Sequence, residues 1–557
     1  MLKKALDKLD YSTSKDDIID DITAGLSVAA IALPQNMAYA LILGLDPIYG
    51  LYTSLVSMFI ASFVGVSNYL IVGPTNLIVV AIASGLSGIS SDQYLEAVLL
   101  LTFMMGVFQL LLAFFKLGDL VNYISRSVIG GLTAGVAIII FSGQLDNLFG
   151  LELPSAPNVF MELYYFIINI EEANLYSVFI GILTISILIL LKRYKPGLPN
   201  YLLAMVVPVG MVYLTGWHTN LEVVENFPAR LPYFTAHSFD LGFIAEYWST
   251  ALSVALLGFI QTLSVIKSLE LKSGQEVELN KVFLGQGIIN LGCSFFSSFG
   301  IAGSFTKSYT NYQAGANSRL SGLITAITVT LFIIFFSPLA GYIPIASLAG
   351  LVIVVAIKMV DFEEIRNSFK NRFDSLIFLA TFITTISLPR LDYAVYFGVI
   401  VSFILVLKNT SSLNYSHFEY EDRGEQFHRR EMSEIENGNF DKESYVLINL
   451  AGNINFNASE NLKHNLDESF VKDQVFIIRL RNVENIDLTS LKELEGFIDR
   501  VNDSGGRVIL CGIDNKIYQM FDRYGIVNKI GRDNVFKADE HIFSSTRSAI
   551  EKAREND

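Results

Sequence analysis

Long apolar runs recur along the chain up to about residue 408, and most of them have the length of a helix that crosses a bilayer. Such a helix needs roughly 20 residues to cross about 30 Å of hydrocarbon. The pattern predicts full spans at residues 22–44, 50–67, 95–115, 122–142, 175–191, 201–216, 248–268, 280–297, 319–337, 343–358, 373–388 and 391–408. Two further segments, 70–85 and 300–316, have apolar cores too short to span. Together these segments predict an α-helical membrane protein of fourteen elements.

The chain after this region has a different composition. Of the 94 Lys, Arg, Asp and Glu residues, 46 lie in 409–557. We therefore divide the chain into a cytoplasmic N-terminal segment (1–20), a transmembrane domain (21–408), a charge-rich linker (409–444) and a soluble domain (445–557). The first twenty residues are polar and lack a secretory signal, so we expect the N-terminus to be retained.

Basic residues in the short connections predict the orientation, because cytoplasmic loops of membrane proteins are enriched in Lys and Arg. These residues cluster in every second connection, at Lys116, Arg126, Lys192, Arg193, Lys195, Lys267, Lys272, Lys281, Arg366, Lys370 and Arg372. The connection 143–175 contains only acidic charges. Both termini are therefore placed in the cytoplasm.

The two short segments are interpreted as half-helices. In the first, residues 73–76 precede an apolar helix that ends near Ser84, and Pro74 suits a first helical turn because it has no N–H to satisfy. In the second, residues 303–304 can cap a helix that runs from 305 until a glycine interrupts it at 315. They are elements three and ten of fourteen. Matching interrupted segments in two halves of seven indicate an inverted repeat with its site at the midplane.

Two helix N-termini that face each other there would form an anion site, because each end presents unpaired N–H groups and about half a positive charge. Lys307, in the first turn of the second half-helix, adds a full charge, which costs about 2.5 to 3.5 kcal/mol or more in mid-membrane. No acidic residue lies nearby in sequence, so we infer that its partner is a transported anion. The alternatives are that Lys307 reaches water along its own stem or pairs with a distant carboxylate.

Polar residues also follow a proline inside the first predicted span. Pro34 removes a backbone hydrogen bond and loosens the helix where Gln35, Asn36 and Tyr39 follow. This pattern predicts that these side chains line a cavity. The alternative is a simple bend, with Gln35 bonded to a neighbouring helix.

The tail has an alternating pattern of its own. Apolar runs of strand length at 445–450, 475–480 and 507–512 are separated by helix-like stretches near 457–469, 488–503 and 514–524. This order predicts an α/β domain whose strands are buried on both faces.

The sequence resembles the sulfate permease (SulP) family of anion transporters over nearly its whole length. AGLSVAAIALPQNMAYALILGLDPIYGLYTS (24–54) is similar to the family's first-span signature, IVGPTNLIVV (71–80) to its third element and GSFTKSYTNYQAGANSRLSGL (303–323) to its tenth. The resemblance implies fourteen helices in a seven-plus-seven inverted repeat, a core domain that moves against a gate domain, a cytoplasmic STAS domain and usually a homodimer. The family's substrate site, between elements one, three, eight and ten, corresponds here to Gln35, Tyr39, Thr75, Asn76, Gln261, Thr306 and Lys307.

Two of these positions depart from the family's pattern. Many relatives carry arginine in place of Lys307, and a point-like ammonium recognises an oxyanion less strictly than a bidentate guanidinium does. Many bacterial and plant relatives have an acidic residue, proposed to couple protons or sodium, in place of Gln261. A glutamine does not titrate. This departure argues against cation symport through position 261 and favours exchange, uniport or coupling elsewhere.

The tail resembles a STAS domain, with the hallmark turn at residues 486–490. Where anti-sigma antagonist relatives have a phosphorylatable serine directly after the Asp, this chain has Leu488, which excludes a phospho-switch at that position. Asp487 is interpreted as a helix N-cap, and modification of Thr489 or Ser490 is the alternative. The domain either regulates transport or assists assembly.

Other classes of function have little support. The only cysteines are Cys293 and Cys511, and the six histidines lie outside the apolar runs, so we expect no metal and no cofactor. No base and nucleophile stand at a recognisable spacing, so we expect no enzyme. The net charge of −14 argues against nucleic-acid binding.

Three functions remain open. A secondary active transporter of a small inorganic anion, working by alternating access, explains all of the patterns above. A nucleobase symporter would be expected to use carboxylates where this chain has Gln261 and Lys307. An anion channel or membrane sensor would differ from a transporter in turnover rather than in its residues. Family frequency favours sulfate, with bicarbonate or chloride exchange or channel-like uniport as the alternative. The few cysteines and the short N-terminus point to a prokaryotic inner membrane.

Overall fold

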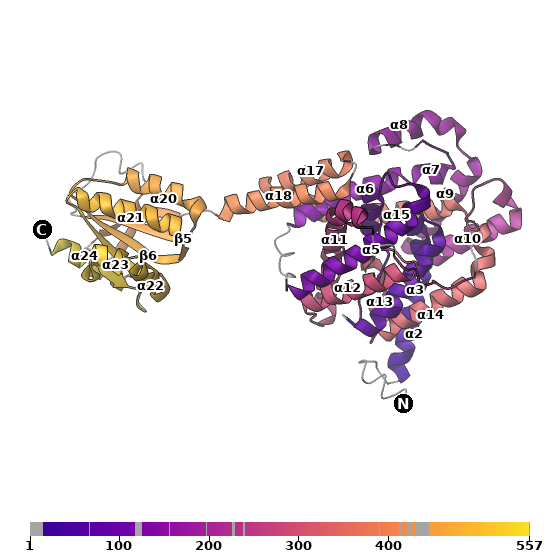
Figure 1. The fold of residues 1–557 in the computed structure, drawn as a ribbon, viewed down its shortest axis with the longest axis horizontal. Coiled ribbons are helices and arrows are strands. Elements are labelled where there is room, and N and C mark those ends of the chain that lie inside the picture. The colour runs from indigo at the N-terminus through magenta and orange to yellow at the C-terminus, as the bar shows by residue number, and fades with distance from the viewer. Residues whose placement is uncertain are drawn as a thin grey trace. The chain divides into compact units, whose positions relative to one another are not determined.

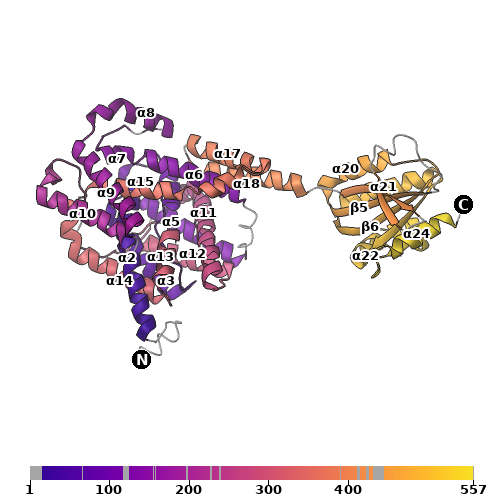
Figure 2. The same ribbon diagram turned by 180° about the vertical axis from the view of Figure 1, so that it is seen from behind.

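The fold is given by a computed structural model. The structure describes residues 15–65, 67–116, 125–154, 156, 158–195, 198–225, 229–237, 240–388, 390–410, 414–421, 426–430 and 445–555. Contacts divide the chain into two compact units, Met1–Ser402 and Phe403–Asp557. Figures 1 and 2 show the first as a bundle of helices and the second as a sheet with helices around it.

A helix lies over each of the fourteen predicted segments of the first unit. These helices are α2 (Lys15–Ile42), α3 (Pro47–Val64), α4 (Asn76–Gly85), α5 (Ser91–Phe114), α6 (Arg126–Ser142), α9 (Leu175–Tyr194), α10 (Asn200–Thr215), α11 (Leu241–Ser273), α12 (Leu279–Phe295), α13 (Phe305–Gln313), α14 (Leu320–Phe336), α15 (Ile345–Met359), α17 (Arg372–Ser387) and α18 (Leu391–Thr410). Short helices α7 (Leu145–Phe149), α8 (Val159–Asn169) and α16 (Phe362–Ser368) connect them. Among the described helices, eight have the length and apolarity of a membrane span. The helical, membrane-type unit is confirmed, while fourteen elements in two halves of seven stay a prediction.

Packing sorts these helices into two groups. In one, which we call the α5 group, α5 packs on α11 and α12, and α3 packs on α2, α12 and α14. The short helices α4 and α13 both pack on α2 and α11 and belong to this group. In the other, the α6 group, α6 packs on α15 and α17, and α9 packs on α10 and α15. Gly398 lets α18 approach Thr381 of α17 and Val128 of α6, so α18 belongs to the α6 group. The groups meet where α2 packs on α10 and α15.

Two extended segments bring the two predicted half-helices together. β1 (Val72–Gly73) pairs antiparallel with β2 (Ala302–Gly303), with Val72 opposite Gly303. α4 starts three residues after β1 and α13 two residues after β2, so both helices begin beside the same small sheet. At 1.5 Å per residue, each helix covers about half of the roughly 30 Å of hydrocarbon. Gly315, with φ of 87°, follows the end of α13 as the sequence predicts.

The second unit is an α/β domain. Its strands, in spatial order, are β4 (Gln426–Arg430), β3 (Asn414–Glu421), β5 (Tyr445–Ile454), β6 (Val475–Ile486), β7 (Arg507–Ile513) and β8 (Val535–Lys537). β5 to β8 are parallel. One core lies between the sheet and α20 (Phe456–Glu468), α21 (Leu488–Asp503), α22 (Asn515–Arg523) and α23 (Ile526–Ile530), and a second lies under α24 (Ser544–Arg554). The strands are thus buried on both faces, as their apolar runs predict.

Part of the predicted linker is strand. β3 and β4 both lie within 409–444, and β3 pairs antiparallel with β5 from Asn414, opposite Ala451, to Phe418, opposite Leu447. The prediction that this whole range is a linker is therefore wrong for 414–421 and 426–430. The polar composition of these strands concealed them, because strands toward the edge of a sheet do not need the continuous apolar run of a central parallel strand.

Asp487 is confirmed as a helix N-cap. Its Oδ1 accepts a hydrogen bond from the backbone N–H of Ser490 at 2.8 Å, at the start of α21. Asp514 does the same for α22, where it accepts from Ile517 at 2.7 Å. A carboxylate at this position satisfies an orphan donor and opposes the partial positive charge of the helix end.

Candidate functional site

The ammonium group of Lys307 lies where three elements meet. Lys307 is in the first turn of α13, and its side chain is fully buried. Its Nζ donates to Oδ1 of Asn36 at 2.5 Å and to the carbonyl oxygen of Pro74 at 3.2 Å. Asn36 belongs to α2, and Pro74 stands just before α4. One charged group therefore joins α13, α2 and the start of α4.

This charge has no carboxylate partner within the described part of the chain. Both atoms that accept from Lys307 are neutral oxygens, and the Tyr39 ring centre lies 5.8 Å from Nζ. A Cβ on Gly73 would lie 3.5 Å from Nζ, so the backbone approaches the ammonium closely. The two alternative interpretations of Lys307, contact with water and pairing with a distant carboxylate, do not describe this arrangement. A buried cation without a counter-charge is costly, and an anion would relieve that cost.

The helix ends beside Lys307 are buried and lack side-chain caps. Thr75 and Ser304 occupy the N-cap positions of α4 and α13, with 2% and 8% of their surfaces exposed. Neither accepts a hydrogen bond from its helix, which corrects the expectation that Ser304 caps α13. Pro74 lies before this cap rather than in the first turn. Two partial positive charges and one full charge therefore collect at the same place.

The structure connects some of the other predicted site residues and leaves one apart. Thr75 Oγ1 donates to Gln261 Oε1 at 3.0 Å, which joins the start of α4 to α11. Asn76 Nδ2 lies 3.0 Å from Met359 Sδ at the end of α15, across the boundary between the two helix groups. Thr306 is exposed, and its side chain makes no hydrogen bond within the described residues.

Gln35 and Tyr39 are buried in α2, which continues as a helix through Pro34. Gln35 Oε1 has no hydrogen-bond partner among the residues that the structure describes. Tyr201 of α10, in the α6 group, lies beside Gln35 and accepts a hydrogen bond from Lys358 at 3.3 Å. Gln35 and Tyr39 thus lie buried at the boundary between the groups, where Gln35 contacts a neighbouring helix, as the alternative interpretation has it. That these side chains line a cavity stays a prediction.

Buried amides and a hydroxyl hold the segment that leads into α13. The Ile301 N–H donates to Asn290 Oδ1 at 2.9 Å, and Asn290 Nδ2 donates to Gln109 Oε1 at 2.9 Å. The Gly303 N–H donates to Thr262 Oγ1 at 2.7 Å. These contacts satisfy backbone groups that a helix or a longer sheet would otherwise pair. They fix where α13 begins, and thereby the position of Lys307.

A second polar cluster joins the two helix groups at the opposite end of α4. Arg390 Nη2 lies 2.9 Å from Asp392 Oδ2 in α18, and Arg390 also donates to Thr250 of α11. Thr250 Oγ1 donates to the same carboxylate oxygen at 3.2 Å, and the Leu391 N–H donates to Ser84 near the end of α4 at 3.2 Å. Hydrogen bonds from a local ion pair and from the Leu391 backbone therefore hold the start of α18 against α11 and α4.

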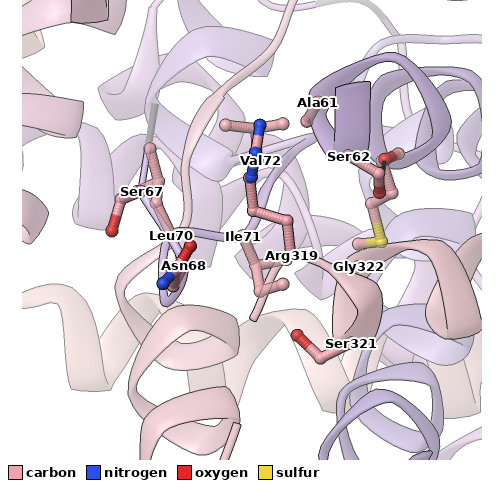
Figure 3. Close-up of a pocket in the computed structure, with 11 residues that line it drawn as sticks. Ala61, Ser62, Ser67, Asn68, Leu70, Ile71, Val72, Arg319, Ser321 and Gly322 are labelled. Atoms are coloured by element: carbon pink, nitrogen blue, oxygen red, sulfur yellow. Dashed lines mark hydrogen bonds between the residues drawn. The ribbon is translucent and has the colours of Figure 1, made fainter. Parts of the chain in front are cut away.

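A pocket lies between the end of α3 and the start of α14, beside the segment that leads into β1. It is lined by Met58, Ala61, Ser62, Ser67, Asn68, Leu70, Ile71, Val72, Arg319, Ser321 and Gly322. Figure 3 shows the Arg319 side chain extending across it toward Val72. A Cβ on Gly65 would overlap the Arg319 guanidinium, so this cation lies at the C-terminus of α3, where it opposes the helix dipole. None of the seven predicted site residues lines this pocket.

Several residues of the site were not among the seven predicted ones. Asn36 was noted only as a polar neighbour of Pro34, and its contact with Lys307 spans 271 positions. Ser308 accepts from the Ile71 N–H at 2.9 Å and so ties α13 to the segment before α4. Met359 and Tyr201 come from helices whose sequences carry no local sign of a site. An amide two residues after a proline, inside an apolar span, is the one signal that pointed to Asn36.

Comparisons with known proteins agree with the two-unit architecture. Residues 18–381 match the model of the sulfate permease family, and residues 438–549 match that of the STAS domain. The chain is 28% identical over 528 residues to a putative sulfate transporter of Bacillus subtilis, covering 94% of this chain and 96% of that one. It is also 30% identical to a probable sulfate transporter and to a chloroplastic sulfate transporter of Arabidopsis thaliana, each over 62% of this chain and about half (52%) of the relative's length.

Two solved structures share the fold. The inward-facing murine Solute Carrier 26 family member A9 superposes with a TM-score of 0.87 at 20% identity, covering 98% of this chain and 93% of that one. The transmembrane domain of a cyanobacterial bicarbonate transporter, BicA, superposes with a TM-score of 0.61 at 24% identity, covering 70% of this chain and 98% of that one. These likenesses concern the fold alone.

Proposed function

Because this chain belongs to the sulfate permease family, we propose that it is a secondary active transporter of inorganic anions and that sulfate is its favoured substrate. The observation that carries the proposal is the fully buried Lys307 ammonium, which lies beside two uncapped helix N-termini and has no carboxylate partner among the described residues. The anion is held between the starts of α4 and α13. Gln35, Tyr39, Thr75, Asn76, Gln261, Thr306 and Lys307 are the proposed binding residues.

The relatives' names support the choice of sulfate. The Bacillus subtilis protein, matched over nearly its full length, is a putative sulfate transporter. A bicarbonate or chloride exchanger, or a channel-like anion uniporter, is the second candidate, because the cyanobacterial protein of similar fold transports bicarbonate. Positive helix ends and one lysine attract all of these anions alike.

The architecture we propose follows from the same features. Fourteen transmembrane elements form two inverted halves of seven, with α4 and α13 as the matching half-helices. The α5 group is the core domain and the α6 group is the gate domain. Both termini lie in the cytoplasm of a prokaryotic cell, the protein resides in the inner membrane as a homodimer, and the STAS domain occupies the cytoplasmic side.

A radiotracer panel in proteoliposomes tests the function. Sulfate, chloride and bicarbonate are compared with and without imposed proton and sodium gradients and with each anion on the opposite side. We expect saturable sulfate uptake that an anion inside the liposomes stimulates. We also expect uptake without an imposed proton gradient, because Gln261 cannot take up or release a proton. Current noise with no counter-flow stimulation would favour the channel, and failure to move any of the three anions would contradict the proposal.

Alternating access can be tested at the Arg390 cluster. A disulfide between Thr250→Cys and Asp392→Cys joins α11 to α18, and Thr250 Oγ1 is 3.2 Å from Asp392 Oδ2 in this structure. If the helix groups move against each other, oxidation stops exchange and dithiothreitol restores it. The matched control is Thr184→Cys with Ser347→Cys, whose oxygens lie 3.1 Å apart in α9 and α15 of one group.

The native cysteines are not expected to form disulfides with the introduced ones. Cys293 and Cys511 are both buried, and burial raises the pKa of the Cys511 thiol to about 12, which keeps it protonated and slow to oxidise. Exchange that survives the Thr250 to Asp392 cross-link at full rate would contradict movement between α11 and α18.

A further inference from the structure

The side-chain amide of Asn36 has a hydrogen bond at its oxygen and none at its nitrogen within the described residues. Asn36 is fully buried in α2. Its oxygen accepts from Lys307 at 2.5 Å, whereas its Nδ2 has no hydrogen-bond partner among the described residues. The assignment of the two amide atoms is fixed by chemistry, because an ammonium group only donates and an amide NH₂ does not accept. A buried donor without a partner is unusual in a folded protein and calls for an explanation.

Lys307 also has a donor to spare. An ammonium group has three N–H bonds. Two of them are directed to Asn36 and to the Pro74 carbonyl, and no further acceptor for the third lies within the described part of the chain. Two unused donors, one on Lys307 and one on Asn36, therefore lie next to each other. They are joined by the short contact between the Lys307 Nζ and the Asn36 Oδ1.

We propose that Asn36 is an anion-binding residue: its Oδ1 holds the Lys307 ammonium beside the start of α4, and its Nδ2 donates to the anion that Lys307 attracts. This inference rests on the proposed transport function and adds a residue to its site. A small anion, whether sulfate, bicarbonate or chloride, accepts from both groups at once. The two donors therefore add to the recognition of an anion and do not choose among these three.

A neutral acceptor suits this role better than a carboxylate. If residue 36 were an aspartate, it would pair with Lys307 as an ion pair and compete with the incoming anion. Asn36 stabilises the buried ammonium when the site is empty, yet it leaves the positive charge uncompensated. The charge therefore remains available to attract the substrate.

The substitution Asn36→Asp tests the proposal, because it keeps the acceptor for Lys307, removes the Nδ2 donor and adds a negative charge. We expect radiolabelled sulfate uptake by full-length protein in proteoliposomes to fall about 100-fold or more, since charge-assisted hydrogen bonds contribute about 10- to 150-fold each. The thermal unfolding midpoint without sulfate should equal or exceed that of the wild type. Added sulfate should raise the midpoint of the wild type and leave that of the variant unchanged.

A matched variant separates this role from general disruption. Asn290→Asp places the same carboxylate at another fully buried amide of the α5 group, whose partners in the described part of the chain are Gln109 and the Ile301 backbone, with no ammonium among them. There we expect a lower unfolding midpoint, because a buried charge is left unpaired. If Asn36→Asp also lowers the midpoint as Asn290→Asp does, or if it transports sulfate normally, the assignment of Asn36 is wrong.

Lys307→Gln distinguishes this inference from the proposed function. Normal sulfate uptake by Lys307→Gln would overturn the location of the site itself. Loss of uptake in Lys307→Gln together with normal uptake and normal sulfate stabilisation in Asn36→Asp would overturn only the role of Asn36.

Discussion

Two helices of the second unit and the two half-helices of the first unit begin in opposite ways. In the second unit, Asp487 and Asp514 cap α21 and α22 with carboxylates. In the first unit, α4 and α13 begin at Thr75 and Ser304, which are buried and make no cap. α5 also begins without a side-chain cap, but its N-cap residue is exposed and water can serve its N–H groups.

This difference shows how the same feature can serve stability or binding. Each helix end carries about half a positive charge. A carboxylate of the chain opposes that charge at α21 and α22. At α4 and α13 no side chain of the described residues caps the helix, and Lys307 increases the charge. The half-helices are thus suited to receive their negative partner from outside.

Among the changes that test this contrast between helix ends, the largest effect is expected from removing the full charge. Lys307→Gln should lower the specificity constant for sulfate uptake roughly 10- to 150-fold, the usual contribution of a hydrogen bond to a charged group. Lys307→Arg should keep part of the activity, because the charge remains while its shape changes. Tracer uptake in proteoliposomes measures both. The control is Lys272→Gln in α11, where the ammonium lies over the Tyr309 ring. We expect this substitution to change sulfate uptake less than about twofold.

The next largest effect is expected from capping an open end. Thr75→Asp gives α4 the kind of cap that α21 has, and should lower sulfate uptake about tenfold or more while the unfolding midpoint stays the same or rises. Initial rates of sulfate uptake and a thermal melt test this. A stable variant with unchanged uptake would mean that the N-terminus of α4 does not contact the anion.

A smaller effect is expected when position 261 becomes titratable. Gln261→Glu places a carboxyl where Thr75 Oγ1 now donates to the amide oxygen. Uptake should become dependent on acidic pH, because only the protonated form leaves the site without a new negative charge. Uptake at a series of pH values, compared with the wild type, measures the change. Equal pH profiles of sulfate uptake for Gln261→Glu and the wild type would show that a charge at position 261 does not affect the bound anion.

The smallest effect on transport is expected in the second unit. Asp487→Ala should lower the free energy of unfolding of that unit by about 1 kcal/mol, the typical contribution of an N-cap. Chemical denaturation of the full chain measures this, and sulfate uptake should be unchanged. A loss of uptake as large as that of Thr75→Asp would remove the contrast between the two kinds of helix end.

The sequence predicted the elements of the site well because their limits are local. Pro74 precedes α4, and Gly315 follows α13, within one or two residues of the expected ends. A lysine in an apolar region is also visible without a structure. The α/β order of the tail followed from its buried apolar strands for the same reason.

The contacts of the site could not be predicted, because they depend on how distant segments pack. The pairing of β1 with β2 and the bond from Lys307 to Asn36 join residues more than two hundred positions apart. Thr306 is exposed rather than joined to the other residues, because adjacent helix positions lie on different faces. The strands β3 and β4 were missed since their side chains alternate without a clear apolar period.

Selenate, a heavier analogue of sulfate, gives the most direct measurement. Anomalous scattering from crystals of the full chain grown in selenate locates the anion without assumptions about the protein. We expect a peak within hydrogen-bond distance of the Lys307 Nζ, between the first turns of α4 and α13. A peak only beside Arg319 or at the protein surface, with none near Lys307 at saturating selenate, would contradict the account.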